Sequence, residues 1–509
     1  MTDDAALNVL LITADQWRGD LLGVAGHPYA RTPNLDALAG SATRFAQHYC
    51  QAYPCGPARA SLLTGLYAHK HRSIRNGTPL DARHPTLFQE VRRAGYGPAL
   101  FGYTDTTLDP RGRPDRDPAR GSYESPAPGV GVELLLDERS APWLAHLRSR
   151  GHDVPDPDAG REGVFARSPF PAPAVFAAED SEAAFLTGRF LDWLGVAGQK
   201  PWFAMMSFIA PHPPFSAARP YQDLIDPAEV TLPRRGASPD VEAAQHPLLR
   251  LLLDDADLSN FIPGLSGPVH TLGDDAVRKV KAVYAAQACE VDHHLGRIFA
   301  ALKASGAWDR TLVVITADHA EQLFDHWLLG KTAFFDQSAH IPLIVRDPRA
   351  GADAGRGRAV EHFTECIDVM PTILEAAGLT APRNCDGSSL LPFCRGETPA
   401  EWRDEVHWAF DFSDVRTRRA ETALSLPSDW CNLQVVRTRA FKYVHFAGLP
   451  PVLFDLRQDP DELVNRADDP AARSTRLEGL DRLLTWRQRT EEHTLTGVLA
   501  HEGRWYGGW

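Results

Sequence analysis

No apolar run in this 509-residue chain approaches the ~18 residues that a membrane-spanning helix needs. The N-terminus, Met-Thr-Asp-Asp followed by an apolar run from Asn8, also lacks the positive charge and the roughly 7–15 apolar residues of a secretory signal peptide. We therefore expect a cytoplasmic protein that does not associate with a membrane.

Basic charge and cysteine are also scarce. The chain carries 53 Lys and Arg against 66 Asp and Glu, a formal net charge of −13, whereas nucleic-acid-binding domains are normally basic. We therefore expect no nucleic-acid partner. The seven cysteines are an odd number spread over a long chain, which favours reduced thiols over a disulfide framework.

Short apolar segments alternate with helical patterns over about the first 390 residues. Strand-like runs occupy residues 9–12, 203–209, 312–316 and 341–345, and the clearest helical pattern covers 274–305. Nearly continuous apolar runs are typical of strands that are covered on both faces. The alternation predicts an α/β fold with a large, mainly parallel central sheet sandwiched by helices. Such a sheet places its functional sites at the carboxyl ends of its strands.

The pattern changes near residue 395. Strand pairs at 406–410, 433–437, 443–446 and 452–455, followed by an Arg-rich helix at 472–489, predict a small antiparallel α+β subdomain. We expect a large α/β domain at 1–395, this C-terminal subdomain at 396–492, and a Gly- and Trp-rich tail at 493–509 that contacts a second subunit. Segments 108–175 and 215–272 are too long for ordinary connections and are interpreted as lids or oligomer contacts over the sheet edge.

Acidic residues stand where two of the strands end. Asp15, followed by Gln16, comes directly after the first strand, and Asp318 with His319 follows the strand at 312–316. Because the carboxyl ends of parallel strands meet at one edge, these groups could converge on one hard metal ion. Helix caps and unrelated strand ends are the alternative interpretations.

Three more residues are candidates for catalysis. Cys55 begins a helix-like run, and a helix N-terminus favours anionic species. Arg59, four residues later, offers a fork of donors that suits a tetrahedral oxyanion. His212 is held between prolines after the strand at 203–209, which suits a general acid. A buried structural cysteine and a histidine that caps a turn are the alternatives.

Together these motifs are similar to those of a known family. The segments that carry the resemblance are Asn8-Val-Leu-Leu-Ile-Thr-Ala-Asp15, Thr32-Pro-Asn-Leu-Asp36, Cys55-x-Pro-x-Arg59-Ala-Ser-Leu-Leu-Thr-Gly65, Ala317-Asp-His319 and Leu453-Phe-Asp-Leu-Arg-Gln-Asp-Pro-Asp-Glu462. They resemble the sulfatase family of the alkaline phosphatase superfamily, in particular its phosphonate monoester hydrolase and arylsulfatase subgroup. The resemblance implies an alkaline-phosphatase-like catalytic domain.

The resemblance also implies a mechanism. In that family a formylglycine-generating enzyme transiently binds the chain and oxidises the signature cysteine, here Cys55, to formylglycine, whose hydrated aldehyde is the nucleophile. Hydrolysis of a sulfate monoester then passes through a covalent sulfo-enzyme intermediate. One divalent metal ion, Ca2+ or Mn2+, is implied. Its implied ligands are Asp15, Gln16, modified Cys55, Asp318 and His319.

Further site residues follow from the same resemblance. Arg59, Asn76 and Lys331 are implied to hold the diol and the nonbridging oxygens of the ester. His212 and Lys331 are implied to neutralise the leaving oxygen. Because two carboxylates only balance the charge of a divalent metal ion, Arg59 and Lys331 leave the site net positive, which suits a monoanionic ester.

Two departures from ordinary sulfatases resemble the phosphonate monoester hydrolases. Gln16 stands where sulfatases usually carry a second aspartate, and Tyr103 stands where a typical sulfatase has Lys-x-His. The hydrated aldehyde carries two hydroxyls, one of which is the nucleophile. Without the Lys-x-His motif, the proton of the second hydroxyl must pass to Asp105, to Tyr103 or to water. Asp105 itself departs from the subgroup, in which we expect threonine at this position.

Three functions stay open on this basis. We expect an arylsulfatase-like hydrolase of small-molecule sulfate esters. The second function is phosphonate monoester or phosphate diester hydrolysis at the same site, since both ester classes are tetrahedral monoanions. The third is a relative with an unmodified Cys55 that is non-enzymatic or transfers phosphate. We also expect a homo-oligomer, either a dimer or a tetramer.

Overall fold

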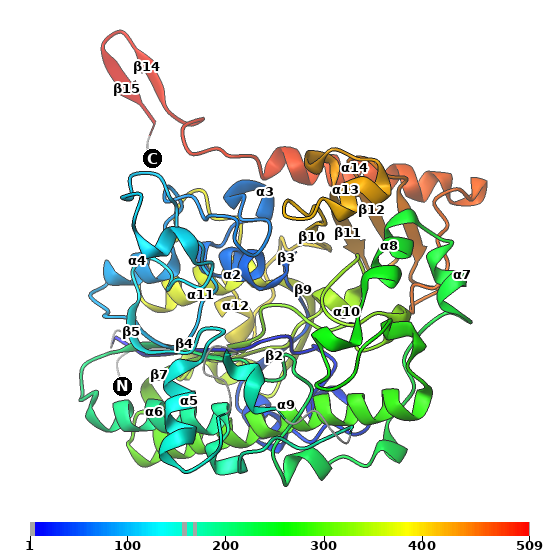
Figure 1. Cartoon of the computed structure of the whole chain (residues 1–509). Coiled ribbons are helices and arrows are strands. Elements are labelled where there is room, and N and C mark those ends of the chain that lie inside the picture. Colours follow the sequence, from blue (N-terminus) through cyan, green and yellow to red (C-terminus); the bar gives the residue numbers. More distant parts are fainter. Residues whose placement is uncertain (1–5, 155–159, 166–169, 508–509) are drawn as a thin grey trace.

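The computed structural model describes residues 6–154, 160–165 and 170–507. An eight-stranded sheet in the order β5-β4-β6-β1-β7-β8-β2-β9 forms its centre. Helices α6 and α9 lie on one face of this sheet, and α2, α4 and α11 lie on the other (Figure 1). The predicted α/β class, with a mainly parallel sheet between helices, is therefore confirmed. No helix within these residue ranges is long and apolar enough to cross a membrane.

The strands of the large sheet are β1 (Asn8–Ala14), β2 (Thr43–Tyr49), β4 (Ala99–Gly102), β5 (Gly131–Leu135), β6 (Phe203–Phe208), β7 (Thr311–Thr316), β8 (Leu343–Arg346) and β9 (Ala359–Glu365). Its helices and the connecting helices are α1 (Pro33–Ala39), α2 (Cys55–Thr64), α3 (Ala68–His71), α4 (Leu87–Arg92), α5 (Ala141–Ser149), α6 (Glu182–Val196), α7 (Pro239–Ala243), α8 (Pro247–Asp255), α9 (Asp274–Ala304), α10 (Asp336–Ala339), α11 (Val369–Ala376) and α12 (Leu391–Cys394).

The central strand β1 determines where the site forms. All seven of its residues are buried, as expected for an apolar strand with helices on both faces. It pairs in parallel with β6 and β7, and Thr13 is in register with both Ser207 and Thr316. These three strands therefore end at one edge of the sheet. The sheet is mixed because β8 runs antiparallel to β7 and β2.

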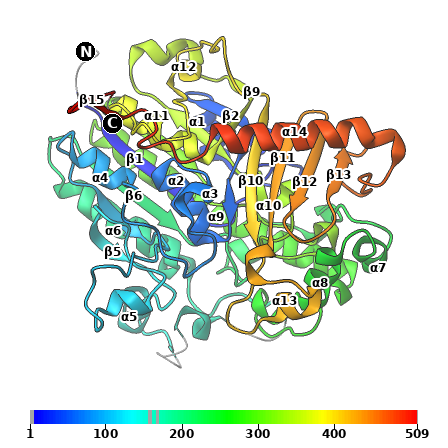
Figure 2. The ribbon, with the colours of Figure 1, turned by 90° about the horizontal axis from the view of Figure 1, so that it is seen from above.

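A second sheet follows in the C-terminal part, in the order β13-β12-β11-β10-β3. Its elements are β3 (Ala52–Tyr53), β10 (Glu405–Asp411), β11 (Asn432–Thr438), β12 (Phe441–Phe446) and β13 (Val452–Asp455), with α13 (Arg419–Leu424) and α14 (Arg473–Arg489). Figure 2 shows α14 lying across these strands. The domain boundary near residue 395 stays a prediction. The second sheet contains strands from both sides of this boundary, because β3, which ends just before Cys55, pairs with β10.

Two long segments differ from what their composition suggested. Segment 108–175 was expected to lie outside the sheet, but it contributes the edge strand β5, which pairs in parallel with β4. Segment 215–272 supplies α7 and α8. The tail forms a hairpin of β14 (Leu499–His501) and β15 (Arg504–Tyr506) that extends away from the body of the molecule (Figure 1). None of the seven cysteines forms a disulfide.

Candidate active site

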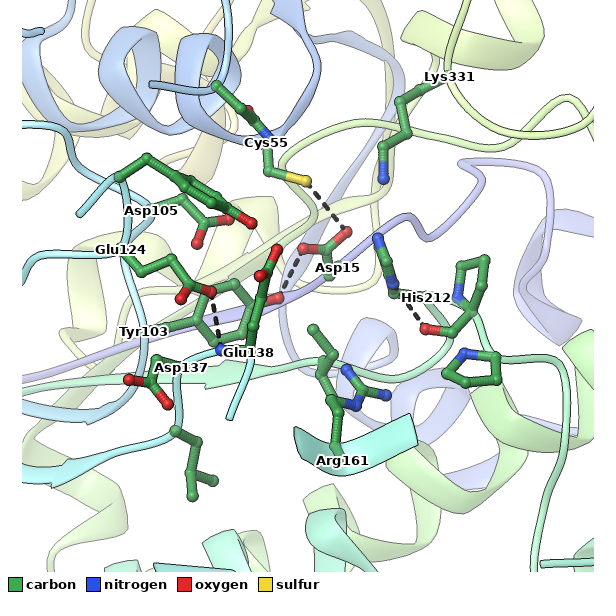
Figure 3. Close-up of a pocket in the computed structure, with 16 residues that line it drawn as sticks. Asp15, Cys55, Tyr103, Asp105, Glu124, Asp137, Glu138, Arg161, His212 and Lys331 are labelled. Carbon is green, nitrogen blue, oxygen red and sulfur yellow. Dashed lines mark hydrogen bonds between the residues drawn. The ribbon is translucent and has the colours of Figure 1, made fainter. Parts of the chain in front are cut away.

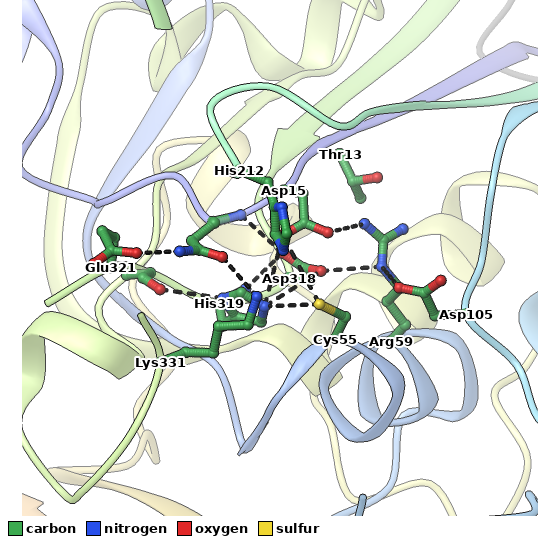
Figure 4. A network of polar contacts seen from close by, with 12 residues as sticks. Thr13, Asp15, Cys55, Arg59, Asp105, His212, Asp318, His319, Glu321 and Lys331 are labelled. Atoms are coloured by element: carbon green, nitrogen blue, oxygen red, sulfur yellow. Dashed lines mark hydrogen bonds and ion pairs between the residues drawn. The ribbon is translucent and has the colours of Figure 1, made fainter. Parts of the chain in front are cut away.

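Three segments bring four predicted metal ligands together. Asp15 follows β1, Asp318 and His319 follow β7, and Cys55 is the first residue of α2. One donor atom from each residue lies within 4.8 Å of the other three, and all four residues are buried. Cys55 Sγ lies 3.2 Å from His319 Nε2 and 3.9 Å from Asp15 Oδ1 (Figure 4).

The donor set fits a divalent cation. Burial, followed by the charge of Asp15, raises the pKa of Asp318 to about 7. The carboxylates of Asp15 and Asp318 therefore repel each other electrostatically. A cation between them would relieve that repulsion. Nδ1 of His319 lies 3.1 Å from the carbonyl oxygen of Ala320. Because a carbonyl only accepts, Nδ1 carries the proton and the lone pair of Nε2 faces the cluster, as in metal-binding histidines.

The carboxyl of Asp15 is kept ionised by its neighbours. Burial alone would raise its pKa, but the positive charges of Lys331 and Arg59 help to hold the pKa below its ordinary value near neutral pH. Burial, followed by the charge of Lys331, lowers the pKa of His319 to about 3 and that of His212 to about 3. Both imidazoles are therefore neutral near pH 7, the form in which histidine binds a metal.

Gln16, also predicted as a metal ligand, contacts other members of the site. Its amide oxygen accepts a hydrogen bond of 2.6 Å from Lys331 Nζ, and its backbone N–H donates to Asp318 Oδ1 at 3.2 Å. Its side-chain nitrogen donates to Glu321. The backbone of Gln16 has a φ of 66°, a costly conformation outside glycine that is retained mainly at functional positions. Ligation of a metal by Gln16 stays a prediction.

Sequence reasoning missed Glu321. This carboxylate is fully buried and also accepts a hydrogen bond of 2.6 Å from the backbone N–H of Gly330. It thereby holds both Gln16 and the loop that carries Lys331. A signal for Glu321 was present in the sequence, because it stands two residues after His319, next to a buried strand. A carboxylate buried there needs a partner, since an unpaired buried charge is costly.

Arg59 is paired with the carboxylates of the cluster. Its Nε donates to Asp318 Oδ2 at 3.0 Å and its Nη2 to Asp15 Oδ2 at 3.2 Å, while Nη1 donates to Ser207 Oγ at 2.7 Å. The guanidinium also lies over the Tyr103 ring, 4.2 Å from its centroid. The side chain is fully buried. The predicted contact of Arg59 with the oxygens of an ester stays a prediction.

Tyr103 and Asp105, the two candidate bases, differ in their surroundings. The Tyr103 hydroxyl donates to Asp15 Oδ2 at 2.6 Å, and burial, followed by the charge of Asp15, raises its pKa well above the ordinary value. Burial raises the pKa of Asp105 to about 8, although Arg59 Nε, 3.7 Å away, opposes that shift. Tyr103 is therefore a hydrogen-bond donor, whereas Asp105 can exchange a proton near neutral pH.

A cavity of about 280 Å³ opens beside the cluster (Figure 3). The predicted residues that line it are Asp15, Cys55, Asn76, Tyr103, Asp105, His212 and Lys331. Asn76 Oδ1 accepts a hydrogen bond of 2.9 Å from the N–H of Gly56 at the start of α2. His212 Nδ1 lies 2.8 Å from the carbonyl oxygen of Pro213 and therefore carries the proton. This leaves Nε2 of His212 as the reactive nitrogen.

One wall of the cavity was not predicted. It is formed by Tyr123, Glu124, Asp137, Glu138 and Arg161. All five come from segment 108–175, which shows little periodicity and so offered no signal for their placement. Figure 3 shows Glu124, Glu138 and Arg161 across the pocket from Lys331.

Comparisons with known proteins agree with this geometry. The family model described as Sulfatase matches residues 7–379, and that described as N-sulphoglucosamine sulphohydrolase, C-terminal, matches residues 324–489. The multifunctional alkaline phosphatase superfamily protein PehA of Trinickia caryophylli is 41% identical over 501 residues, 96% of each chain.

Two solved structures are similar over nearly the whole chain. The phosphonate monoester hydrolase of Agrobacterium radiobacter is 44% identical, with a TM-score of 0.95 over 99% of this chain and 100% of that one. The phosphonate monoester hydrolase SpPMH of Silicibacter pomeroyi is 38% identical, with a TM-score of 0.92 over 99% of each chain.

Proposed function

The chain belongs to the sulfatase family, and on this premise we propose that it hydrolyses phosphonate monoesters, using formylglycine at position 55 and one divalent metal ion. The observation that carries the proposal is the buried cluster of Asp15, Cys55, Asp318 and His319 beside a cavity with Lys331 and His212. The similarity to two phosphonate monoester hydrolases supports this ester class over sulfate monoesters, which the sequence placed first.

Asp15, Asp318 and His319 would hold the metal. When bound, a divalent ion supplies Lewis acidity at the reacting centre, and formylglycine supplies the nucleophile. Cys55 lies at the N-terminus of α2, within 4.8 Å of the other three donors, so the nucleophile and the metal would share one place. Peptide mass spectrometry of protein made together with the modifying enzyme tests the modification. Full activity with only the unmodified thiol at position 55 would exclude it.

Lys331 and His212 provide donors on the cavity side of the cluster. Lys331 is oriented by its hydrogen bond to Gln16 and faces Cys55 (Figure 3), so it can stabilise negative charge on both the nonbridging and the leaving oxygens of the ester. His212 is neutral in the free site and presents Nε2. It can donate to the leaving oxygen only after it takes up a proton, which the negative charge of the bound ester favours.

Asp105 is the better candidate for the base. Tyr103 already donates a hydrogen bond to Asp15 and has a strongly raised pKa, so its hydroxyl stays protonated and cannot act as a base. Asp105 lines the same cavity and has its pKa raised by burial to about 8. A general base works best when its pKa is near the working pH. We therefore propose that Asp105 removes the proton from the second hydroxyl of the hydrated formylglycine.

Sulfate monoester hydrolysis is the second candidate, favoured by the match to the family model described as Sulfatase. Two substrates with the same leaving group separate the candidates: para-nitrophenyl methylphosphonate and para-nitrophenyl sulfate. We expect the larger kcat/KM for the phosphonate. A larger value for the sulfate would restore the arylsulfatase assignment, and failure to hydrolyse either would remove both.

A further inference from the structure

A second cavity, of about 410 Å³, borders the active site at Lys331. Lys331 lines both cavities. Two other segments of the chain also line both cavities. Cys55 and Asn76 line the first cavity, and the residues that precede them, Pro54 and Arg75, line the second. The two cavities therefore adjoin along three separate segments of the chain.

The second cavity is apolar in its interior. Leu251 and Leu252 of α8 form one side, and Phe261, Phe410 and Phe412 form the others. Side chains of this kind stabilise a bound apolar group by removing its surface from water.

Besides Lys331 and Asp414, the charged residues that line the second cavity form two ion pairs. Arg75 Nη1 lies 3.0 Å from Asp411 Oδ1, and Arg419 forms an ion pair with Asp255. Because these charges are already compensated, an ionic group would gain little here and would lose hydration. The cavity is therefore suited to an uncharged aryl or alkyl group.

We propose that the second cavity binds the organic substituent that remains on phosphorus when the ester is cleaved. This inference rests on the proposed function. His212, assigned to the leaving oxygen, lines the first cavity, so the leaving group belongs there. A phosphonate monoester carries one further organic group, and the adjoining cavity beyond Lys331 can hold it. The enzyme then selects phosphonate monoesters whose substituent on phosphorus is larger than methyl.

Binding of two simple phosphonates tests the cavity without any turnover. Phenylphosphonate and methylphosphonate differ only in the group that the cavity would receive. By isothermal titration calorimetry we expect phenylphosphonate to bind at least about tenfold more tightly, since a fitted apolar group in a hydrophobic pocket is worth roughly that or more. Equal affinities would overturn the inference.

A variant and a matched control locate the preference. Leu252→Glu places a carboxylate at a half-buried position of the cavity. Because a carboxylate there opposes binding of an apolar group, the preference for phenylphosphonate over methylphosphonate should fall below about threefold. Leu480→Glu makes the same change on α14, where Leu480 is 41% exposed, and should retain the preference. A preference that survives Leu252→Glu and also the cavity-enlarging Phe261→Ala would overturn the inference.

Turnover then assigns the cavity to one side of the ester. Para-nitrophenyl esters of phenylphosphonate and methylphosphonate vary the retained group, whereas phenyl and methyl esters of methylphosphonate vary the leaving group. Leu252→Glu should lower the ratio of kcat/KM only in the first pair. A change confined to the second pair would show that the cavity takes the leaving group. Absence of all turnover would count against the proposed function, while the calorimetry would still decide whether the cavity binds the apolar group.

Discussion

The hydroxyl of Tyr103 donates a hydrogen bond of 2.6 Å to Oδ2 of Asp15, the carboxylate at the end of the central strand. Oδ1 of the same carboxylate lies 3.6 Å from His319 Nε2. The tyrosine therefore orients a proposed metal ligand without itself being one, so the residues that would control metal binding extend beyond the four donors.

Tyr103→Phe should lower the metal affinity by about 10–100-fold, the usual cost of losing a partner that orients a ligand. The measurement is calorimetric titration of the apoprotein with Mn2+ or Ca2+. Tyr96→Phe is the matched control, because its hydroxyl donates at 2.6 Å to the carbonyl of Leu7, away from the site. Unchanged metal affinity in Tyr103→Phe would show that the hydrogen bond does not hold Asp15 in place.

Asp105→Asn should lower kcat by about 10²–10⁴-fold if Asp105 is the base. The base must be ionised, and burial raises its pKa to about 8, so activity should rise with pH through the Asp105 ionisation. The variant cannot ionise and should lose that ascending limb. Asp137→Asn removes another carboxylate of the same cavity and should keep it. An ascending limb that persists in Asp105→Asn would reassign the base.

His212→Ala and Lys331→Ala should slow esters of poor leaving groups most. Negative charge builds on the leaving oxygen most when its conjugate acid is weak, and removal of a general acid costs about 10²–10⁴-fold. Rates on a series of aryl esters with graded leaving-group pKa measure this dependence. A residue that only holds nonbridging oxygens would give equal losses across the series, so a slope no steeper than that of the unmutated enzyme would contradict the assignment.

Removal of the tail 493–509 should reduce the oligomeric state. In the terminal hairpin Leu499 is 60% exposed, Trp505 69% and Tyr506 48%, and apolar surface of this kind on a projecting element is typical of a contact with another subunit. Sedimentation velocity of the full and truncated chains measures the change. Equal sedimentation coefficients, after correction for mass, would refute an assembly role.

Glu290→Gln should stabilise the protein above neutral pH. Burial raises the pKa of Glu290, on α9, from 4.5 to about 7. The stabilising contribution of protonated Glu290 is therefore fully present below pH 4.5 and is lost as pH rises through 7. The loss lowers the free energy of unfolding by about 3 kcal/mol. The neighbouring His294 does not compensate, because burial lowers its own pKa to about 3.

Urea unfolding at pH 5 and pH 8 measures the effect of this substitution. The free energy of unfolding of Glu290→Gln should exceed that of the unmutated protein at pH 8 and approach it at pH 5. Glu179→Gln, at an exposed position, should follow the unmutated protein at both. An equal difference at the two pH values would mean that Glu290 does not titrate between them.

Much of this site could be predicted because its residues stand beside local patterns. Asp15 and Asp318 follow continuous apolar runs, and such runs form buried parallel strands whose carboxyl ends share one edge. Cys55 and Arg59 lie one helical turn apart at the start of α2. Periodicity over five to ten residues was enough to place these residues at strand ends or on a helix.

Only the tertiary structure decided which partner each side chain has. Gln16 contacts Lys331 across 315 residues of chain, and Arg59 pairs with Asp318 across 259. These pairings depend on how buried charges are compensated once the strands are assembled, and spacing along the chain carries no record of that. The same holds for the cavity beyond Lys331, because α8, β10 and the loop after β7 form it jointly. The sequence thus determined the reactive groups and the edge where they meet, whereas packing between distant segments determined their orientation and the space around them.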